Sequence, residues 1–128
     1  MCYFLYVATK DEISEGLVEL YQQDHNIYFD KVNEYLKINV SNQYYLIHRQ
    51  CSCDFIRTSD NSYNEISALF NILSKPFEII LLDKSNFPDV ELDDVIINDT
   101  LTEELSLNKF LMLYPDKLVS SRKYIVGI

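Results

Sequence analysis

The chain has 128 residues, of which 48% are hydrophobic, and it contains only two glycines and three prolines. This length and composition fit one folded domain, residues 1–128, and exclude a disordered or low-complexity chain. Eleven basic residues face twenty acidic ones, so the formal net charge is −9. Because nucleic acids and anionic membranes bind basic surfaces, this charge argues against both as partners.

The cysteine content and the N-terminus indicate where the protein resides. Three cysteines, Cys2, Cys51 and Cys53, are too few and too unevenly spaced for the disulfide framework of a small secreted protein. The apolar start, residues 1–8, lacks the basic region of a secretory signal and is too short for one. No stretch approaches the roughly 20 apolar residues of a membrane-spanning helix. We therefore expect a cytoplasmic protein.

The chain is expected to begin with a strand and a helix. Residues 2–9 are aromatic and β-branched, which favours a buried strand. Thr9-Lys-Asp-Glu12 has the spacing of a capping box, so it predicts a helix that starts there and ends near residues 24–26. Four apolar residues at helical spacing define the face expected to be buried: Ile13, Leu17, Leu20 and Tyr21.

A mostly extended region is expected next. Residues 27–29 are compatible with a short strand, and residues 35–40 alternate well enough to form another. Ser41-Asn42 is a plausible turn into the following apolar run. We therefore predict a hairpin in which residues 36–40 pair with residues 44–50.

The second helix is the clearest element of the chain. Ser62-Tyr-Asn-Glu65 forms a capping box, and Lys75-Pro76 should close the helix. The run Phe77–Leu82 is almost continuously apolar, as expected of a central strand covered on both faces. The helix's buried face is predicted from residues at positions i, i+3, i+4 and i+7: Ile66, Leu69, Phe70 and Leu73.

The last third of the chain is expected to hold an acidic connection, a helix and a strand. Residues 83–99 form the connection, which could contain a short strand at residues 95–97. Thr100-Leu-Thr-Glu103 has capping-box spacing and predicts a third helix that ends at Pro115. Residues 124–126 favour a final strand. The third helix's buried face is predicted to comprise Leu107, Phe110, Leu111 and Tyr114.

These elements follow one another in the order β-α-β-β-α-β-α-β. No repeat or linker interrupts them. The simplest arrangement is an α+β fold with a single mixed or antiparallel sheet of about five strands and three helices packed on it.

Two cysteine-bearing segments resemble those of a group of small bacterial proteins. Met1-Cys-Tyr-Phe-Leu-Tyr-Val-Ala-Thr9 is similar to their start, Met-Cys-x-aromatic-Leu-Tyr, and Cys51-Ser-Cys-Asp-Phe55 to their Cys-x-Cys-x-Phe element. Residues 122–126 resemble their closing strand. This chain departs from the group in lacking the glycines that surround the second motif. The resemblance implies that the three cysteines belong to one motif, and it implies no activity.

The thiols are the first candidate site. Cys51 and Cys53 on a strand would point to the same face with Cα atoms roughly 6.5–7 Å apart, which is too far for an unstrained disulfide. If the N-terminal strand lies beside them, Cys2 would add a third thiol, and His48 or a carboxylate could complete a zinc site. His48 has the opposite parity, however, and Cys-x-Cys is not the usual zinc spacing. Small buried core residues and redox chemistry are the alternatives.

The second candidate site is a segment of seven acidic residues with no basic residue among them. It does not match a calcium loop, because the positions that need Gly and Glu hold Asp94 and Thr100. A solvated loop, a docking surface for a basic partner and a cation site all stay open, and the last three acids would also suit a helix N-terminus. The seven residues are Asp89, Glu91, Asp93, Asp94, Asp99, Glu103 and Glu104.

Nothing in the sequence indicates catalysis. Two glycines are too few for a phosphate-binding loop or a dinucleotide fingerprint, and His25 and His48 have no metal-ligand spacing. The leading hypothesis is therefore a non-enzymatic, acidic protein-binding module without a cofactor. An inhibitor or immunity protein that neutralises a basic partner is one concrete form. The alternative is a metal-binding or redox protein that uses Cys2, Cys51 and Cys53.

Overall fold

The structure is a computed structural model that describes residues 3–49, 60–83, 91–98, 102–114 and 117–127. Six strands form one mixed sheet in the order β2-β3-β1-β4-β6-β5, in which only the β5–β6 pair is parallel. The strands are β1 (Tyr3–Thr9), β2 (Tyr28–Lys31), β3 (Gln43–His48), β4 (Phe77–Asp83), β5 (Thr102–Leu105) and β6 (Lys123–Val126). The predicted α+β class with a single sheet is confirmed, with one strand more than expected.

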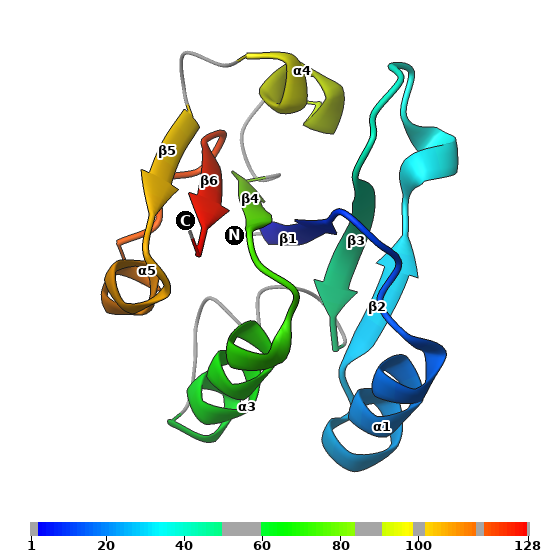
Figure 1. Ribbon diagram of the computed structural model, residues 1–128, viewed down its shortest axis with the longest axis vertical. Helices are drawn as coiled ribbons and strands as arrows, with labels where there is room; N and C mark the ends of the chain where they lie inside the picture. The colour runs from blue at the N-terminus through cyan, green and yellow to red at the C-terminus, as the bar shows by residue number, and fades with distance from the viewer. Residues whose placement is uncertain (1–2, 50–59, 84–90, 99–101, 115–116, 128) are drawn as a thin grey trace.

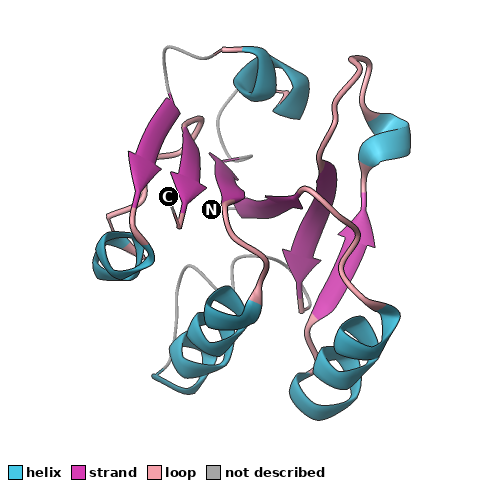
Figure 2. Ribbon diagram, in the orientation of Figure 1, coloured by secondary structure: helices cyan, strands magenta, loops and turns pink. Residues whose placement is uncertain are grey.

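Helices cover both faces of this sheet unequally. Figure 1 shows α1, α3 and α5 on one side of the strands and the short helix α4 on the other, and Figure 2 distinguishes helices from strands by colour. We call the side of α1, α3 and α5 the first face and the side of α4 the second face. The helices are α1 (Glu15–His25), α3 (Asp60–Ile72), α4 (Leu92–Ile97) and α5 (Leu107–Leu113), with a 3₁₀ turn η1 at Asn33–Tyr35.

Alternation along the strands divides the core into two layers. In β1, Leu5 and Val7 point to the first face, while Tyr6 and Ala8 point to the second. The central strand β4 is buried on both faces, as its apolar run predicts. The first-face layer is the larger one and is centred on aromatic residues: the ring of Phe70 lies 5.2 Å from that of Phe110 and 5.9 Å from that of Phe77.

The second predicted helix and the final strand lie where the sequence predicts them. Helix α3 begins at Asp60, slightly before the predicted capping box, and ends at Ile72. The final strand β6 lies where residues 124–126 predict it. Pro115, the expected end of the last helix, lies outside the described residues. All the residues predicted for the buried face of α3 are buried: Ile66, Leu69, Phe70 and Leu73.

The first helix starts later than predicted. Thr9 still belongs to β1, where it pairs with Gln43 of β3, and its hydroxyl donates to the Asp11 carbonyl at 2.6 Å. Ser14 caps the helix instead, because its Oγ accepts a hydrogen bond from the Leu17 amide at 3.2 Å. Leu20, predicted to be buried, is 50% exposed, whereas Tyr21 is buried and Ile13 and Leu17 are partly buried against the core.

The predicted hairpin between residues 36–40 and 44–50 is wrong. β3 pairs with β2 on one side and β1 on the other, and residues 36–42 connect η1 to β3 without regular structure. The Asn33 side chain explains the difference, because its Oδ1 accepts from the Tyr44 amide at 2.7 Å and its Nδ2 donates to the Asn42 carbonyl at 2.9 Å. These bonds occupy backbone groups that a hairpin partner would need.

The acidic connection also differs from its prediction. Residues 95–97 belong to helix α4 and not to a strand, because Leu92, Val95 and Ile96 have helical spacing and pack on the second face. The expected helix start at residues 100–103 is wrong as well, since Thr102–Leu105 is strand β5. Helix α5 begins after Ser106, whose Oγ accepts from the Lys109 amide at 3.2 Å.

Candidate functional site

The structure splits the predicted acidic segment between two elements. Asp94 is exposed on α4 and Glu91 is exposed at its N-cap, whereas Glu103 and Glu104 lie on the edge strand β5. Glu103 pairs with Arg122 at 3.1 Å, so part of its charge is neutralised. The expectation that Glu103 and Glu104 stabilise the N-terminal end of the third helix is wrong, because both lie in β5 and α5 begins only at Leu107. Asp89 and Asp99 lie outside the described residues.

Within α4, one acid has a structural task. The Asp93 carboxylate accepts a hydrogen bond from the Lys37 amide at 2.7 Å, which ties α4 to the irregular residues 36–42. Buried Leu92 and Val95 hold the inner side of the helix on the second face. Residues 91, 94 and 97 therefore form its outer side.

We call this outer side, Glu91, Asp94 and Ile97, the α4 surface. Ile97 is 61% exposed, although it is a large apolar residue. Neither Glu91 nor Asp94 forms an ion pair with a basic residue in the part of the chain that the structure describes. The surface combines two acidic side chains, neither paired with a described basic residue, with an exposed apolar side chain, and these are features of protein-contact surfaces.

The three predicted thiols, Cys2, Cys51 and Cys53, lie outside the described residues. Their predicted companion His48 is described, and its Nε2 lies 2.6 Å from the Asp30 carboxylate. Its Nδ1 lies 3.2 Å from the Arg49 carbonyl, and its ring stacks on Tyr28 at a centroid distance of 5.5 Å. Among the described residues, no three His, Cys, Asp or Glu side chains come together in a way that could hold a metal ion.

A polar cluster that sequence reasoning missed lies on the second face. The Glu78 Oε2 accepts hydrogen bonds from Asn42 Nδ2 at 2.7 Å and from the Tyr44 hydroxyl at 3.0 Å. Glu78 Oε1 lies 3.7 Å from the Lys123 ammonium, which also donates to the Ile96 carbonyl at 3.3 Å. In the sequence, the one sign of this cluster is that Glu78 interrupts the apolar run of β4. The sequence does not indicate which residues Glu78 contacts.

The cluster changes the acidity of its tyrosine. Burial, together with the negative charge of Glu78 and the hydrogen bond to it, raises the pKa of Tyr44. Burial and the charge of Glu91 also raise the pKa of Tyr6, to about 12. Both phenols therefore stay neutral at physiological pH, and Tyr44 acts as a hydrogen-bond donor to the carboxylate.

A pocket of about 540 Å³ opens beside this cluster. Residues 10–11, 41–42 and 74–78 line it together with Ile125, so it lies where the ends of β1 and α3 meet the start of β4. Its volume is within the range of about 300–1,000 Å³ that is typical of small-molecule sites. Glu78, whose side chain is 12% exposed, is one of its lining residues.

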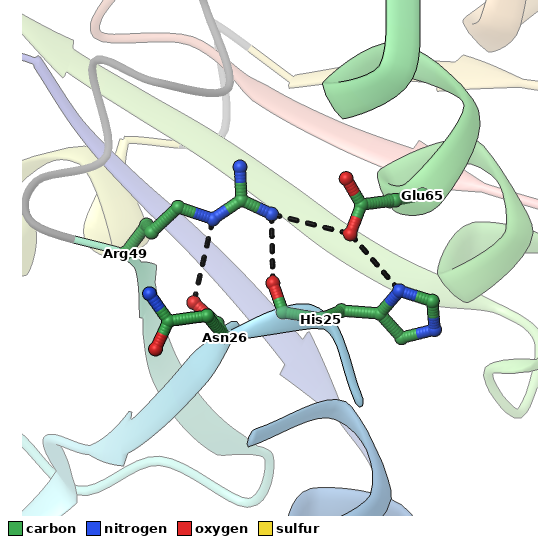
Figure 3. A network of polar contacts seen from close by, with 4 residues as sticks. All are labelled: His25, Asn26, Arg49 and Glu65. Carbon is green, nitrogen blue, oxygen red and sulfur yellow. Dashed lines mark hydrogen bonds and ion pairs between the residues drawn. The ribbon is translucent and has the colours of Figure 1, made fainter. Parts of the chain in front are cut away.

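A second polar network joins three elements at the opposite end of β3 (Figure 3). Arg49 donates to the carbonyl oxygens of His25 at 2.8 Å and Asn26 at 3.4 Å, which end helix α1. The same guanidinium lies 3.3 Å from the Glu65 carboxylate of α3, and that carboxylate also contacts His25 Nδ1 at 2.9 Å. Arg49 thus neutralises the C-terminal end of α1 and links it to α3.

No protein-family model, curated protein or solved structure matches this chain. In the described residues, no helix is both long enough and apolar enough to cross a membrane.

Proposed function

We propose that this protein is a non-enzymatic, acidic protein-binding module that docks on a basic partner through the α4 surface. One observation carries the proposal. Glu91 and Asp94 present their charges on the outer side of α4 with no basic partner among the described residues, next to the exposed Ile97.

Helix α4 is held firmly on the sheet, which suits a surface that binds another protein. Two buried residues, the Asp93 contact with the Lys37 amide and the Lys123 contact with the Ile96 carbonyl hold the helix in place. A docking surface on a fixed element loses little conformational entropy on binding. The net charge of −9 would steer a basic protein toward it and accelerate association at low salt.

An inhibitor or immunity protein that neutralises a basic enzyme or toxin is the form of this function that we propose. Such a protein needs a stable, charged recognition surface and no chemistry of its own. The cytoplasm is the compartment that fits it, because the chain has too few cysteines for a secreted disulfide framework.

Affinity capture with defined variants tests the proposal. The immobilised chain is incubated with bacterial lysate, and retained proteins are identified and purified for binding measurements at about 50 mM and about 500 mM salt. We expect a basic partner whose dissociation constant rises steeply with salt. Glu91→Lys/Asp94→Lys should weaken binding at least about tenfold, because each reversed charge repels the basic surface.

The matched control is Glu19→Lys/Asp24→Lys, which reverses two exposed acids on α1 and makes the same change in net charge. It should leave the affinity within about threefold of that of the unmodified chain, apart from the general effect of net charge. Circular dichroism checks that both double variants are folded. Equal loss of binding in both variants, or a partner that is itself acidic, would refute the α4 surface as the docking site.

A further inference from the structure

We propose that His48 forms a pH-sensitive link that holds the edge strand β2 on β3 and weakens when the imidazole ring loses a proton. The link consists of the His48 ring at the end of β3, the Asp30 carboxylate of β2 and the carbonyl of Arg49. We call these groups the His48 link. It lies apart from the α4 surface and does not depend on the docking function.

Both ring nitrogens of His48 face oxygen acceptors. Nε2 lies 2.6 Å from the Asp30 carboxylate, and Nδ1 lies 3.2 Å from the Arg49 carbonyl. A neutral imidazole has one N–H group and one bare nitrogen, whereas the imidazolium has two N–H groups. Only the protonated ring can therefore donate to both acceptors, and its bond to the carboxylate is then charge-assisted.

The neutral ring weakens the link in either tautomer. If the proton stays on Nε2, the bond to Asp30 loses the charge of its donor, and the bare Nδ1 faces the lone pairs of the Arg49 carbonyl. If the proton stays on Nδ1, the bare Nε2 faces the Asp30 carboxylate, and the two acceptors repel each other. The link is therefore complete while the ring is charged and weakens as the pH rises through the range in which histidine titrates, about pH 5 to 8.

Strand β2 is the element that should respond. It has four residues, and among the described strands it pairs with β3 alone. The Tyr28 ring lies directly opposite His48 in the register and stacks on the imidazole at a centroid distance of 5.5 Å. One imidazole thus contacts both Tyr28 and Asp30 of β2. Because a short edge strand opens more easily than a central one, a change in these contacts should alter how often β2 separates from β3.

The other charged groups described around His48 have partners of their own. The Arg49 guanidinium belongs to the network of Figure 3. Lys31, the other charged residue of β2, pairs with Glu12. On the β1 side, the next position after the Leu5–Ile47 pair is Phe4, an apolar residue of the second face. The β2 carboxylate is therefore the charge that the His48 ring contacts.

The second histidine of the chain provides an internal comparison. His25 Nδ1 lies 2.9 Å from the Glu65 carboxylate, but that carboxylate also lies 3.3 Å from the Arg49 guanidinium. A charged His25 would share its carboxylate with a permanent cation, so its protonation should change the structure less than that of His48.

Hydrogen exchange measured at about pH 5.5 and about pH 8 tests the proposal, with rates expressed as protection factors so that the intrinsic effect of pH is removed. We expect protection of the β2 amides that bond to β3 to fall about twofold to fivefold relative to β4 as the pH rises, which is the range for a partly exposed ion pair. Ring ¹⁵N spectra of His48 should show protons on both nitrogens before this fall and on one nitrogen after it.

Two variants and two controls assign the effect to the link. Asp30→Asn removes the charged acceptor at a site that is 62% exposed, and it should make β2 protection nearly independent of pH. His48→Phe keeps a ring against Tyr28 and should give low β2 protection at both pH values. Asp24→Asn, the same change of charge at an exposed position of α1, and His25→Phe should both keep the pH dependence of the unmodified protein.

Three results would overturn the proposal. They are β2 protection that does not fall between the two pH values, an unchanged fall in Asp30→Asn, or a fall that disappears in His25→Phe but not in His48→Phe. The first of these is measured on the unmodified protein, so the test does not depend on any variant folding. Failure here leaves the docking proposal unaffected, since that rests on the α4 surface.

Discussion

Glu78 and Lys123 face each other on adjacent strands, with 3.7 Å between carboxylate and ammonium, and only 12% and 10% of their side chains are exposed. They lie on the second face, beside apolar residues of β4 and α4. A nearly buried ion pair gains strength from the low local dielectric, but each of its members depends on the other for compensation of its charge.

Removing one member of this pair should be costly. Lys123→Met is expected to lower the free energy of unfolding by about 3 kcal/mol, because it leaves the Glu78 charge without its ion-pair partner. Urea denaturation followed by circular dichroism measures the change. Glu78→Leu/Lys123→Met should recover much of the loss, since no isolated charge then remains.

Arg122→Met breaks the more exposed pair with Glu103 and should cost less than about 1 kcal/mol. Equal costs for the two single variants would contradict this interpretation.

The Tyr6 hydroxyl should make the fold sensitive to alkali. Its pKa is raised to about 12 in the folded protein, against an ordinary value of 10.0, so the folded state keeps a proton that the unfolded chain loses. The stability from this group is therefore complete below pH 10 and is lost as the pH rises toward 12, with a slope of at most about 1.4 kcal/mol per pH unit. Denaturation midpoints measured across this range test the slope.

Tyr6→Phe should reduce that alkaline slope while preserving stability at neutral pH. The substitution removes the titrating hydroxyl and keeps the buried ring. Tyr35→Phe is the control, because the Tyr35 ring is 74% exposed. An unchanged slope in Tyr6→Phe would show that other groups cause the alkaline loss.

The Arg49 network should determine how firmly the end of α1 is held. Arg49→Ala removes donors to two carbonyl oxygens and the ion pair with Glu65, so we expect a loss of about 2 kcal/mol. Hydrogen exchange should become faster at residues 21–27, whereas β4 should change only with global stability. Lys31→Ala, which breaks an exposed pair with Glu12, should cost less than about 1 kcal/mol and leave exchange at residues 21–27 unchanged.

Phe70 should be the most sensitive position of the predicted face of α3. Its ring is fully buried and lies 5.2–5.9 Å from the rings of Phe110, Tyr114 and Phe77, so Phe70→Ala should cost about 3–5 kcal/mol. Phe70→Leu should cost less and keeps the measurement possible if the alanine variant does not fold.

Leu20→Ala is the matched test on α1. Because Leu20 is 50% exposed, this variant should change the free energy of unfolding by no more than about 0.5 kcal/mol. A large loss there would mean that Leu20 is buried, as the sequence periodicity predicts.

Several elements could be predicted from the sequence because their signals are local. Strand β1, helix α3 and strands β4 and β6 appear where alternation, helical spacing and a continuous apolar run predict them. Each of these patterns lies within the element itself. The acidic character of residues 91–94 was visible for the same reason.

The failures have a common physical origin in contacts between distant residues. Thr9 and Ser14 both have residue types that can cap α1, and the pairing of Thr9 with Gln43 in the sheet leaves the cap to Ser14. The side chain of Asn33 replaces a hairpin partner through bonds to Asn42 and Tyr44. Strand β5 exists because it pairs in parallel with β6, about twenty residues later in the chain.

The same division holds for the candidate sites. Composition and local pattern determined the α+β class, the negative charge and the apolar faces, because each depends on residue type and spacing alone. Only the tertiary structure decided that α4 presents Glu91 and Asp94 while β5 carries Glu103 away from them. It also brought Glu78 and Lys123 together from distant parts of the sequence. Pairing of strands and burial of charge are cooperative properties of the folded chain, so no local pattern in the sequence encodes them.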